Sequence, residues 1–284
     1  MRNSTEIYSL LEKITWQDKR ILALYMNGSR VNPNVMQDDF QDYDVVFVVT
    51  ETSSFINDKK WINNFGNPFY FQLPDENPNF PNDKENFYGY LVQFDDGVRL
   101  DIHIETLSHA LENIKNDSLC KILIDKNNYL PAIDESSDKN YCVKQPSQEQ
   151  FLACCNEFWW CTNNLAKGLA RKEILYVQDM ANFVVRKELE KMLSWKVGIK
   201  TDFKVSVGKS AKYFSKWLSK NEYQDYLQTF FSCDIDSAWK SIFLMCDMFE
   251  KTALEVSTFL KFEYNQTESK NAKTYLENIF ALEN

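Results

Sequence analysis

Two aspartates separated by a single residue, Asp42 and Asp44, stand directly before the apolar run 45–49. Side chains alternate along a β-strand, so both carboxylates project from one face. Neighbouring carboxylates repel each other, and a divalent cation relieves that repulsion. The spacing predicts a site for a hard metal ion such as Mg²⁺. Asp38 and Asp39 precede the strand, and we interpret them as part of a solvated loop.

A glycine–serine turn, Gly28-Ser29, lies between these acids and the apolar run 21–26, which we predict to be a buried strand. Glycine has no Cβ and tolerates positive φ, so the backbone amides of such a turn can approach a phosphate closely. Ser29 could also simply close the turn, but the aspartates that follow favour phosphate contact. A phosphate-binding turn beside a hard-metal site is what phosphoryl or nucleotidyl transfer needs.

A third carboxylate is predicted from a hairpin farther along the chain. An Asp-Gly turn within 95–97 lies between two alternating apolar runs, which indicates paired strands. The second of these strands places Asp101, His103 and Glu105 on one face. Asp101 completes a three-acid metal site if this strand lies next to that of Asp44, and otherwise it is a surface acid. We assign no role to His103, and Glu105 either orients a substrate or is a strand-end charge.

The chain of 284 residues is long enough for two domains, and its pattern changes near Pro146. We predict an α+β fold, in which domain 1–145 is a mixed β-sheet flanked by helices and domain 146–284 is an α-helical bundle. No proline follows Pro146, which favours continuous helices. Ser147 and Gln150 have the spacing of a capping box.

The remaining elements are predicted from periodicity and composition. Helices are expected over 5–14, with Ser4 or Thr5 as the N-cap, and over 178–197, 209–218, 222–231, 237–260 and 272–279. A surface loop near the mouth of the site is expected over 66–86, and a last strand or buried turn over 119–125.

Composition limits the partners. A net charge of −9 leaves no surplus of basic residues for a nucleic acid, and it suits a cationic substrate, although acidity for solubility alone would explain it equally well. The seven cysteines form no CxxC pair, as is usual in a reducing compartment. The polar N-terminus and the short run 21–26 predict neither a signal peptide nor a membrane span. We expect a cytoplasmic protein with no membrane partner.

At this point a family resemblance emerges. The order Asn27-Gly28-Ser29-Arg30, then Asp-x-Asp, then a later strand aspartate resembles the polymerase-β-like nucleotidyltransferase superfamily. Segments 28–34, 40–44 and 154–160, together with 167–169 and 205–209, resemble the aminoglycoside 6-adenylyltransferases, which modify streptomycin. The resemblance covers nearly the whole chain, and the motifs of the helical half narrow it to this one family.

The resemblance implies an Mg²⁺-dependent nucleotidyltransferase domain followed by an aminoglycoside-binding helical domain. The reaction would transfer AMP from ATP to the 6-hydroxyl of streptomycin, release pyrophosphate and confer resistance. The implied metal ligands and catalytic residues are Asp42, Asp44 and Asp101. The residues expected to bind ATP are Gly28, Ser29 and Arg30, with Lys167, Lys209 and Lys212 of the helical half, unless those lysines are only solvated.

In the helical half, Glu157 interrupts an aromatic run that must be mostly core. It either caps a neighbour or meets a cation of the drug, and with Trp159 and Glu105 it is our candidate for substrate binding. Two other functions remain open: transfer to another aminoglycoside or a protein hydroxyl, or a non-catalytic nucleotide-binding, toxin-neutralising protein. The latter would usually have lost an acid or Ser29. We expect a monomer or a weak homodimer.

Overall fold

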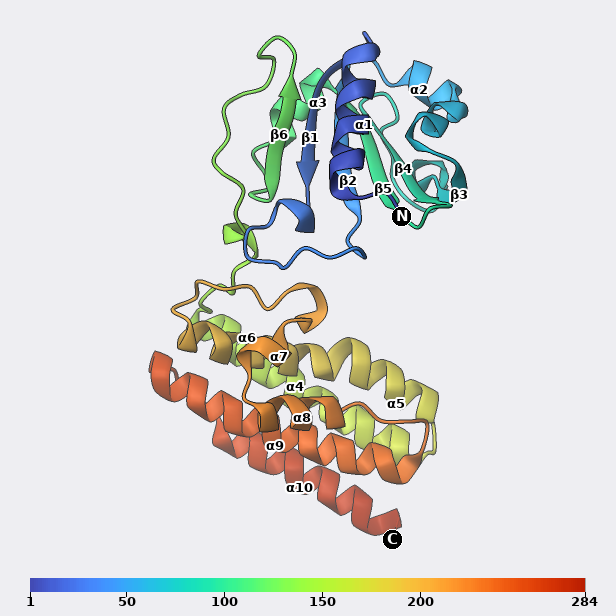
Figure 1. Cartoon of the computed structure of the whole chain (residues 1–284). Helices are drawn as coiled ribbons and strands as arrows, with labels where there is room; N and C mark the ends of the chain where they lie inside the picture. The colour runs from blue at the N-terminus through green and yellow to red at the C-terminus, as the bar shows by residue number, and fades with distance from the viewer. Residues whose placement is uncertain (284) are drawn as a thin grey trace. The chain divides into compact units, whose positions relative to one another are not determined.

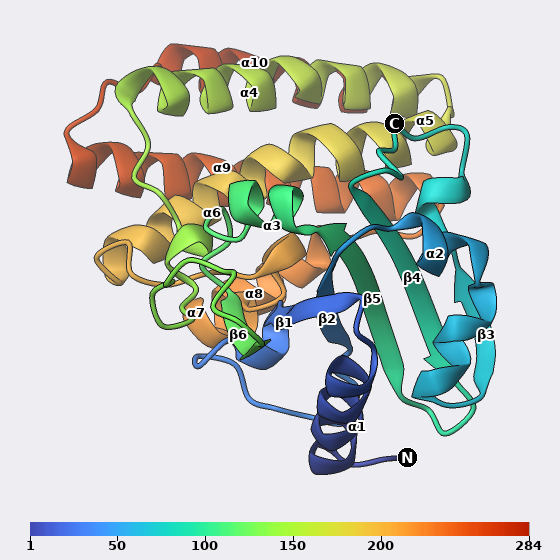
Figure 2. The same cartoon turned by 90° about the horizontal axis from the view of Figure 1, so that it is seen from above.

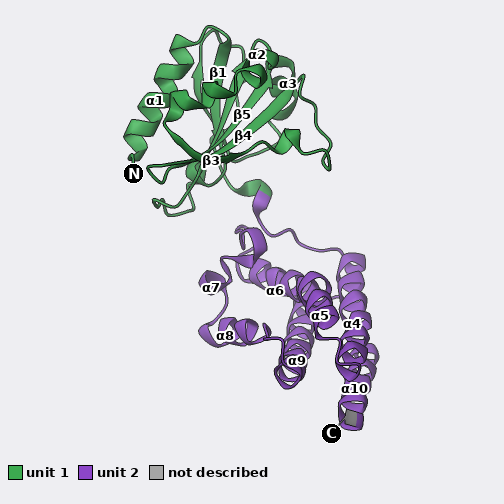
Figure 3. Cartoon of the chain, turned by 90° about the vertical axis from the view of Figure 1, so that its right-hand side faces the viewer, with its two compact units in different colours: residues 1–140 green, residues 141–284 purple. Residues whose placement is uncertain are grey.

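The computed structural model describes residues 1–283, which divide into two compact units at 140/141 (Figure 3). The sequence suggested a boundary at 145/146. Each unit has hydrophobic clusters of its own: two in the first unit, on the two faces of its sheet, and one in the second. The two units are described separately below.

The first unit is built on a sheet whose strands lie in the order β3-β4-β5-β2-β1-β6. β2 and β5 are parallel, and the other neighbours are antiparallel, so the sheet is mixed as predicted. The strands are β1 (Ile21–Asn27), β2 (Tyr43–Val49), β3 (Pro68–Gln72), β4 (Phe87–Phe94), β5 (Arg99–Thr106) and β6 (Cys120–Asp125).

Helices cover the two faces of the sheet unequally (Figures 1 and 2). One face packs against α1 (Ser4–Gln17), α2 (Ser53–Asn57) and the 3-10 helix η2 (Lys59–Phe65). On the other face, α3 (Leu107–Asn113) follows the end of β5 and folds back over Val46 and Val48. Side chains of β2 therefore alternate between the two faces, with Val46 and Val48 on the α3 face and Tyr43, Val45 and Phe47 on the α1 face.

Two local predictions were wrong. The N-cap of α1 is Asn3, whose side chain accepts a hydrogen bond from the Glu6 amide while the Glu6 carboxylate accepts one from the Asn3 amide. Segment 66–86 is not only a loop, because it contains the edge strand β3 and the 3-10 helix η3 (Pro74–Glu76). Pro68 is the first residue of β3, a position at which proline costs no ladder hydrogen bond.

The second unit is helical as predicted, and α4 begins with the expected capping box of Ser147 and Gln150. Phe158 stacks on Phe249 at 3.7 Å between ring centroids in its core. None of the described helices is long and apolar enough to cross a membrane. The helices are α4 (Gln148–Ala170), α5 (Ile174–Met180), the π-helix η5 (Ala181–Val185), α6 (Arg186–Lys200), α7 (Phe214–Trp217), α8 (Lys220–Gln228), α9 (Ile235–Leu260) and α10 (Gln266–Glu283).

The run 209–218 is not the single helix that was predicted. It holds the short 3-10 helix η6 (Lys209–Ala211) and, after a break, α7. Gly208 has φ of 73°, and Ser210 has φ of 55° inside η6. Left-handed backbone at these positions prevents a continuous right-handed helix.

An ion pair joins the N-terminus to the hairpin of β4 and β5. Arg2 Nε lies 2.6 Å from Asp96 Oδ2, and the Arg2 amide also donates to that oxygen. Arg2 Nη1 donates to the Phe65 carbonyl. The hydrogen bonds from Arg2 lower the pKa of the Asp96 carboxyl to about 2. The pair therefore fastens the start of α1 to the turn between β4 and β5.

We predict that Asp96→Asn lowers the free energy of unfolding at pH 7 by about 1–2 kcal/mol. The folded pKa lies below the unfolded one, so the stabilisation is present above about pH 4 and disappears as the pH falls toward 2. Thermal melting of wild type and variant at pH 7 and pH 3 measures it. Asp95→Asn, at an exposed neighbouring position, is the control. An equal difference at both pH values would show that the carboxylate charge is not responsible.

Candidate active site

Three carboxylates meet where β2 and β5 begin. Asp42, Asp44 and Asp101 each offer an oxygen, and these oxygens all lie within 4.8 Å of one another. Asp101 is buried, with 8% of its surface exposed, whereas the other two are partly exposed. Asp42 directly precedes β2, and Asp44 is its second residue. The structure thus brings together the three acids that the sequence selected.

Strand register produces this cluster. In the parallel pair, Asp44 lies opposite Asp101, and on the other side of β2 Asn27 lies opposite Asp44. Cys120 of β6 continues the same row, opposite Asn27. Directly paired residues project from the same face of a sheet. One cross-strand row on the α3 face therefore holds two of the acids and an amide.

The cluster carries more negative charge than Arg99, its one cationic partner among residues 1–283, can balance. Arg99 donates from Nε and Nη2 to the two oxygens of Asp101 at 2.8 and 2.7 Å, and its Nε lies 3.6 Å from Asp42. Burial, together with the charges of Asp42 and Asp101, raises the pKa of Asp44 to about 7. One guanidinium against three carboxylates leaves a deficit that a divalent cation would remove.

These residues fit Mg²⁺. Carboxylate oxygens are its preferred protein ligands, and close carboxylates with an unbalanced charge are the setting in which it binds. Asp42, Asp44 and Asp101 would hold the ion. Arg99, whose side chain is 48% exposed, must release Asp101 when that happens.

The backbone turn beside the acids accepts only glycine. Gly28 has φ of 78°, and a Cβ built on it would lie 2.0 Å from Oδ2 of Asp44. The turn continues into the 3-10 helix η1 (Ser29–Val31), so Ser29 comes immediately after the contact with Asp44. The turn therefore lies directly against the acids, and the predicted contact of its amides with a phosphate stays a prediction.

Comparison with known proteins agrees with this geometry. The family model for streptomycin adenylyltransferase matches residues 1–279. The chain belongs to this family. It is 34% identical to the aminoglycoside 6-adenylyltransferase of Staphylococcus aureus and 32% identical to that of Bacillus subtilis, over 99% of both chains in each case. It is 36% identical to the Campylobacter jejuni enzyme over 93% of this chain and 91% of that one.

Among solved structures, an aminoglycoside 6-adenyltransferase from Bacillus subtilis covers 99% of both chains at 29% identity, with a TM-score of 0.49. The sequence comparisons identify the protein as a nucleotidyltransferase enzyme, as expected. They assign no role to individual residues of this adenylyltransferase.

Arg30 is bound to the loop that precedes β2. Its guanidinium stacks on the Tyr43 ring at 3.7 Å and donates to the carbonyls of Asp42 and Gln41 at 3.1 and 2.6 Å. Tyr43 alternates with Asp44 and packs on the α1 face, opposite the carboxylates. Arg30 thus holds the loop that carries Asp42, and its expected contact with ATP stays a prediction.

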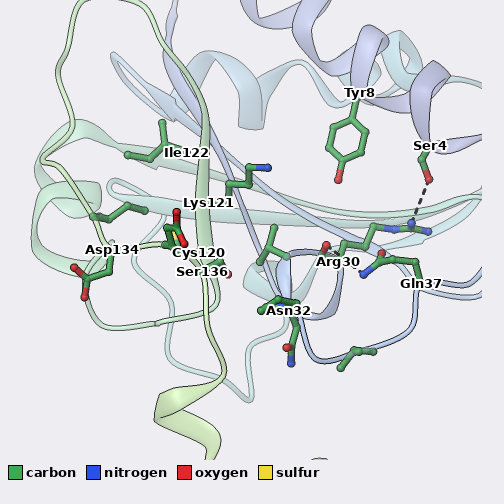
Figure 4. Close-up of a pocket in the computed structure, with 15 residues that line it drawn as sticks. Ser4, Tyr8, Arg30, Asn32, Gln37, Cys120, Lys121, Ile122, Asp134 and Ser136 are labelled. Atoms are coloured by element: carbon green, nitrogen blue, oxygen red, sulfur yellow. Dashed lines mark hydrogen bonds between the residues drawn. The ribbon is translucent and has the colours of Figure 1, made fainter.

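Arg30 lines a pocket of about 900 Å³ to which residues of η1 and of the edge strand β6 contribute. Figure 4 shows Arg30 among the residues that line it. Ser4, Tyr8 and Lys121 also line this pocket. Arg30 donates to the Ser4 hydroxyl at 3.4 Å. These contacts join η1 to α1 and agree with a positioning role for the arginine.

Glu105 lies on the same face of β5 as Asp101, but it is enclosed. Only 2% of its surface is exposed, and it accepts hydrogen bonds from the Tyr25 hydroxyl at 2.5 Å and His109 Nδ1 at 2.7 Å. His109 belongs to α3. Glu105 therefore anchors α3 to the sheet, and its expected contact with a substrate is not supported by this placement.

The expected substrate residues of the helical unit differ in exposure. Trp159 is 2% exposed and donates from Nε1 to the Tyr264 hydroxyl at 3.2 Å, so it is a core residue, whereas Trp160 is 68% exposed. Glu157 is exposed beside a pocket of about 570 Å³. Three lysines were expected to bind ATP. Lys167 is half-buried in the last turn of α4, whereas Lys209, in η6, and Lys212, directly after η6, are exposed.

Two polar groups of the site were missed from the sequence. Arg99 pairs with the acids because it lies two residues before Asp101 on the same face, which strand alternation alone would have indicated. The Oδ1 atom of Asn27 is buried and has no hydrogen-bond partner among the described residues. Its signal in the sequence was its place directly before Gly28. An unpaired buried amide at this row is available to a ligand.

We predict that Asp42→Asn or Asp44→Asn abolishes nucleotidyl transfer and leaves the fold intact. Each replacement removes a negative charge that Mg²⁺ binding requires, and it relieves repulsion in the unliganded protein. Pyrophosphate release from ATP should fall at least about a hundredfold, which corresponds to about 2.7 kcal/mol in the barrier. The melting temperature should not fall.

The control is Asp38→Asn, because Asp38 is an exposed acid in the loop before the site. It should keep wild-type turnover. If either site variant kept more than about a tenth of wild-type turnover, the assignment of the metal to these acids would be wrong.

Proposed function

We propose that this enzyme transfers AMP from ATP to the 6-hydroxyl of streptomycin and releases pyrophosphate, with Mg²⁺ as cofactor. The observation that carries the proposal is the contact of Gly28 with Asp44 inside the cluster that Asp42 and Asp101 complete. A glycine turn next to three carboxylates joins a phosphate site to a metal site. The family match and the names of the relatives supply the acceptor class.

The chain's residues divide the work of the reaction. The turn at Gly28 and Ser29 holds the terminal phosphates of ATP with backbone amides and a hydroxyl. Asp42, Asp44 and Asp101 hold the metal, and Arg30 keeps the Asp42 loop in place. When bound, Mg²⁺ offsets the negative charge that builds up on the phosphoryl oxygens.

Asp101 is the proposed proton acceptor. The acceptor hydroxyl loses its proton to this carboxylate, its oxygen bonds to the α-phosphorus, and the bond to the β-phosphate oxygen breaks to give pyrophosphate. Arg99 occupies both oxygens of Asp101 in the structure, so it must move before the proton can be accepted. Its partly exposed side chain has room to do so.

The helical unit offers a site for a cationic group. The pocket of about 570 Å³ is lined by Glu157 and Glu188, by Trp195 and by two lysines, Lys144 and Lys191. Both oxygens of Glu188 accept hydrogen bonds from Lys191, whereas no Lys or Arg partner is recorded for Glu157 among the described residues. We propose that Glu157 pairs with a guanidinium of the drug. The surplus of acidic residues in the chain suits a cationic substrate.

The function is tested with purified protein, ATP, Mg²⁺ and a panel of streptomycin, kanamycin and spectinomycin. Of the three drugs, we expect only streptomycin to cause pyrophosphate release. Its product should be heavier than the drug by one adenylyl group, and NMR should locate that group on O-6. The Asp42→Asn enzyme is the control for contaminating activity. Equal turnover with kanamycin or spectinomycin would mean a different acceptor hydroxyl, and turnover with none would contradict the proposal.

We predict that Glu157→Gln raises the KM for streptomycin by up to about tenfold and leaves the KM for ATP nearly unchanged. Losing a charge-assisted hydrogen bond costs about 1.5–3 kcal/mol, and solvent screening at this exposed position keeps the effect near the lower limit. Steady-state kinetics with each substrate varied in turn measures it. Glu277→Gln, at an exposed position of α10, is the control. Unchanged drug affinity would return Glu157 to a surface role.

A further inference from the structure

A small pocket lies on the sheet next to the three acids. Of the residues that line it, only Arg99 has a part in the proposed mechanism. The pocket has a volume of about 170 Å³ and lies across β3, β4 and β5. Its side-chain lining includes Tyr70, Gln72, Leu91, Gln93 and Arg99. It is a shallow shelf with room for one ring of a larger molecule.

Strand register places this shelf directly beside Asp101. Gln72 pairs with Leu91, and Leu91 pairs with Asp101, which extends the row of acids to the sheet edge. In the next row, Tyr70 pairs with Gln93, and Gln93 pairs with Arg99. Since paired residues share a face, the lining side chains project on the same side as the carboxylates.

The in-line geometry of nucleotidyl transfer indicates which reactant lies on the shelf. The attacking and leaving oxygens must stand roughly in line on opposite sides of the α-phosphorus. The glycine turn that would hold the leaving pyrophosphate is at the end of β1, on one side of the acids. The strand order β1-β2-β5-β4-β3 then puts the attacking hydroxyl on the other side, toward β4 and β3.

The side chains of the shelf suit a polar ring. Tyr70 is 64% exposed and offers an aromatic face, on which a sugar ring or a guanidinium can stack. The amides of Gln72 and Gln93 supply donors and acceptors for ring hydroxyls.

We propose that Tyr70, Gln72 and Gln93 form an acceptor shelf, which holds the aminoglycoside ring whose hydroxyl is adenylylated. The assignment rests on the proposed function and adds to it the residues that present the acceptor. Arg99 borders the shelf, and in the structure its guanidinium is paired with Asp101 and Asp42. The shelf lies wholly within the first unit.

The test compares Tyr70→Ala with Phe69→Ala. Phe69 is the neighbouring residue of β3, is 72% exposed and does not line the pocket, so both variants lose a similar exposed ring. Tyr70→Ala should raise the KM for streptomycin about tenfold, with the KM for ATP within about twofold of wild type. Phe69→Ala should change neither constant, and Tyr70→Phe, which keeps the ring, should recover most of the affinity.

The outcomes separate the shelf from the function. If wild type adenylylates streptomycin and Tyr70→Ala has an unchanged KM for the drug, the shelf is wrong and the function stands. If the KM for ATP rises instead, the pocket holds the adenosine, and the proposal is also overturned. Wild type that adenylylates no aminoglycoside contradicts the function and the shelf with it. Melting temperatures of the three variants verify that the edge strand is intact.

Discussion

The parallel pairing of β2 with β5 is the constraint on which the site depends. It places Asp44 directly opposite Asp101, and the polypeptide cannot separate the two charges without changing the register of the sheet. A shift of one residue would turn every side chain of β5 to the opposite face, exposing Leu100, Ile102 and Ile104 and burying the acids. Hydrophobic packing against the α1 face therefore maintains an electrostatically unfavourable cluster on the other.

The two ends of the α3 face differ in how their polar groups are satisfied. Under α3, the carboxylate of Glu105 is fully enclosed and receives hydrogen bonds from Tyr25 and His109. Asn27 Oδ1, at the end of β1 opposite Asp44, and His103 Nδ1, two residues after Asp101 on β5, are buried with no hydrogen-bond partner in the described part of the chain. In native proteins most buried polar groups have a hydrogen-bond partner. Unpaired polar groups near Asp44, a carboxyl group whose pKa is raised, therefore indicate a binding site independently of any sequence motif.

The three aspartates of the site could be predicted from short-range sequence patterns. The orientation of Arg30 and the burial of Trp159 depend on long-range contacts. The Asp-x-Asp spacing and the Asp-Gly turn depend on a few neighbouring residues, so both could be predicted, as could the capping box at Ser147. Whether Arg30 faces a phosphate or a loop carbonyl depends on which face of the sheet Tyr43 occupies. Likewise, Trp159 and Trp160 are adjacent in sequence, and only the packing of α4 against other helices determines which one is buried.

The edge strand β3 was missed for a related reason. A proline- and asparagine-rich sequence predicts a loop, and the pairing of Tyr70 with Gln93 and Gln72 with Leu91 comes from β4 and not from local propensity. Beyond the end of β3, the carboxylate of Asp75 accepts the Gly89 amide at 2.8 Å, so a side chain replaces the strand in the ladder. The backbone amide of Gly89 on β4 is thus paired with a side chain, whereas Tyr70 on β3 belongs to the outermost strand of the sheet. The outer edge of β3 carries the exposed rings of Phe69 and Tyr70, whereas β4 at Gly89 is covered by the Asp75 side chain, so the two ends of this side of the sheet are protected differently.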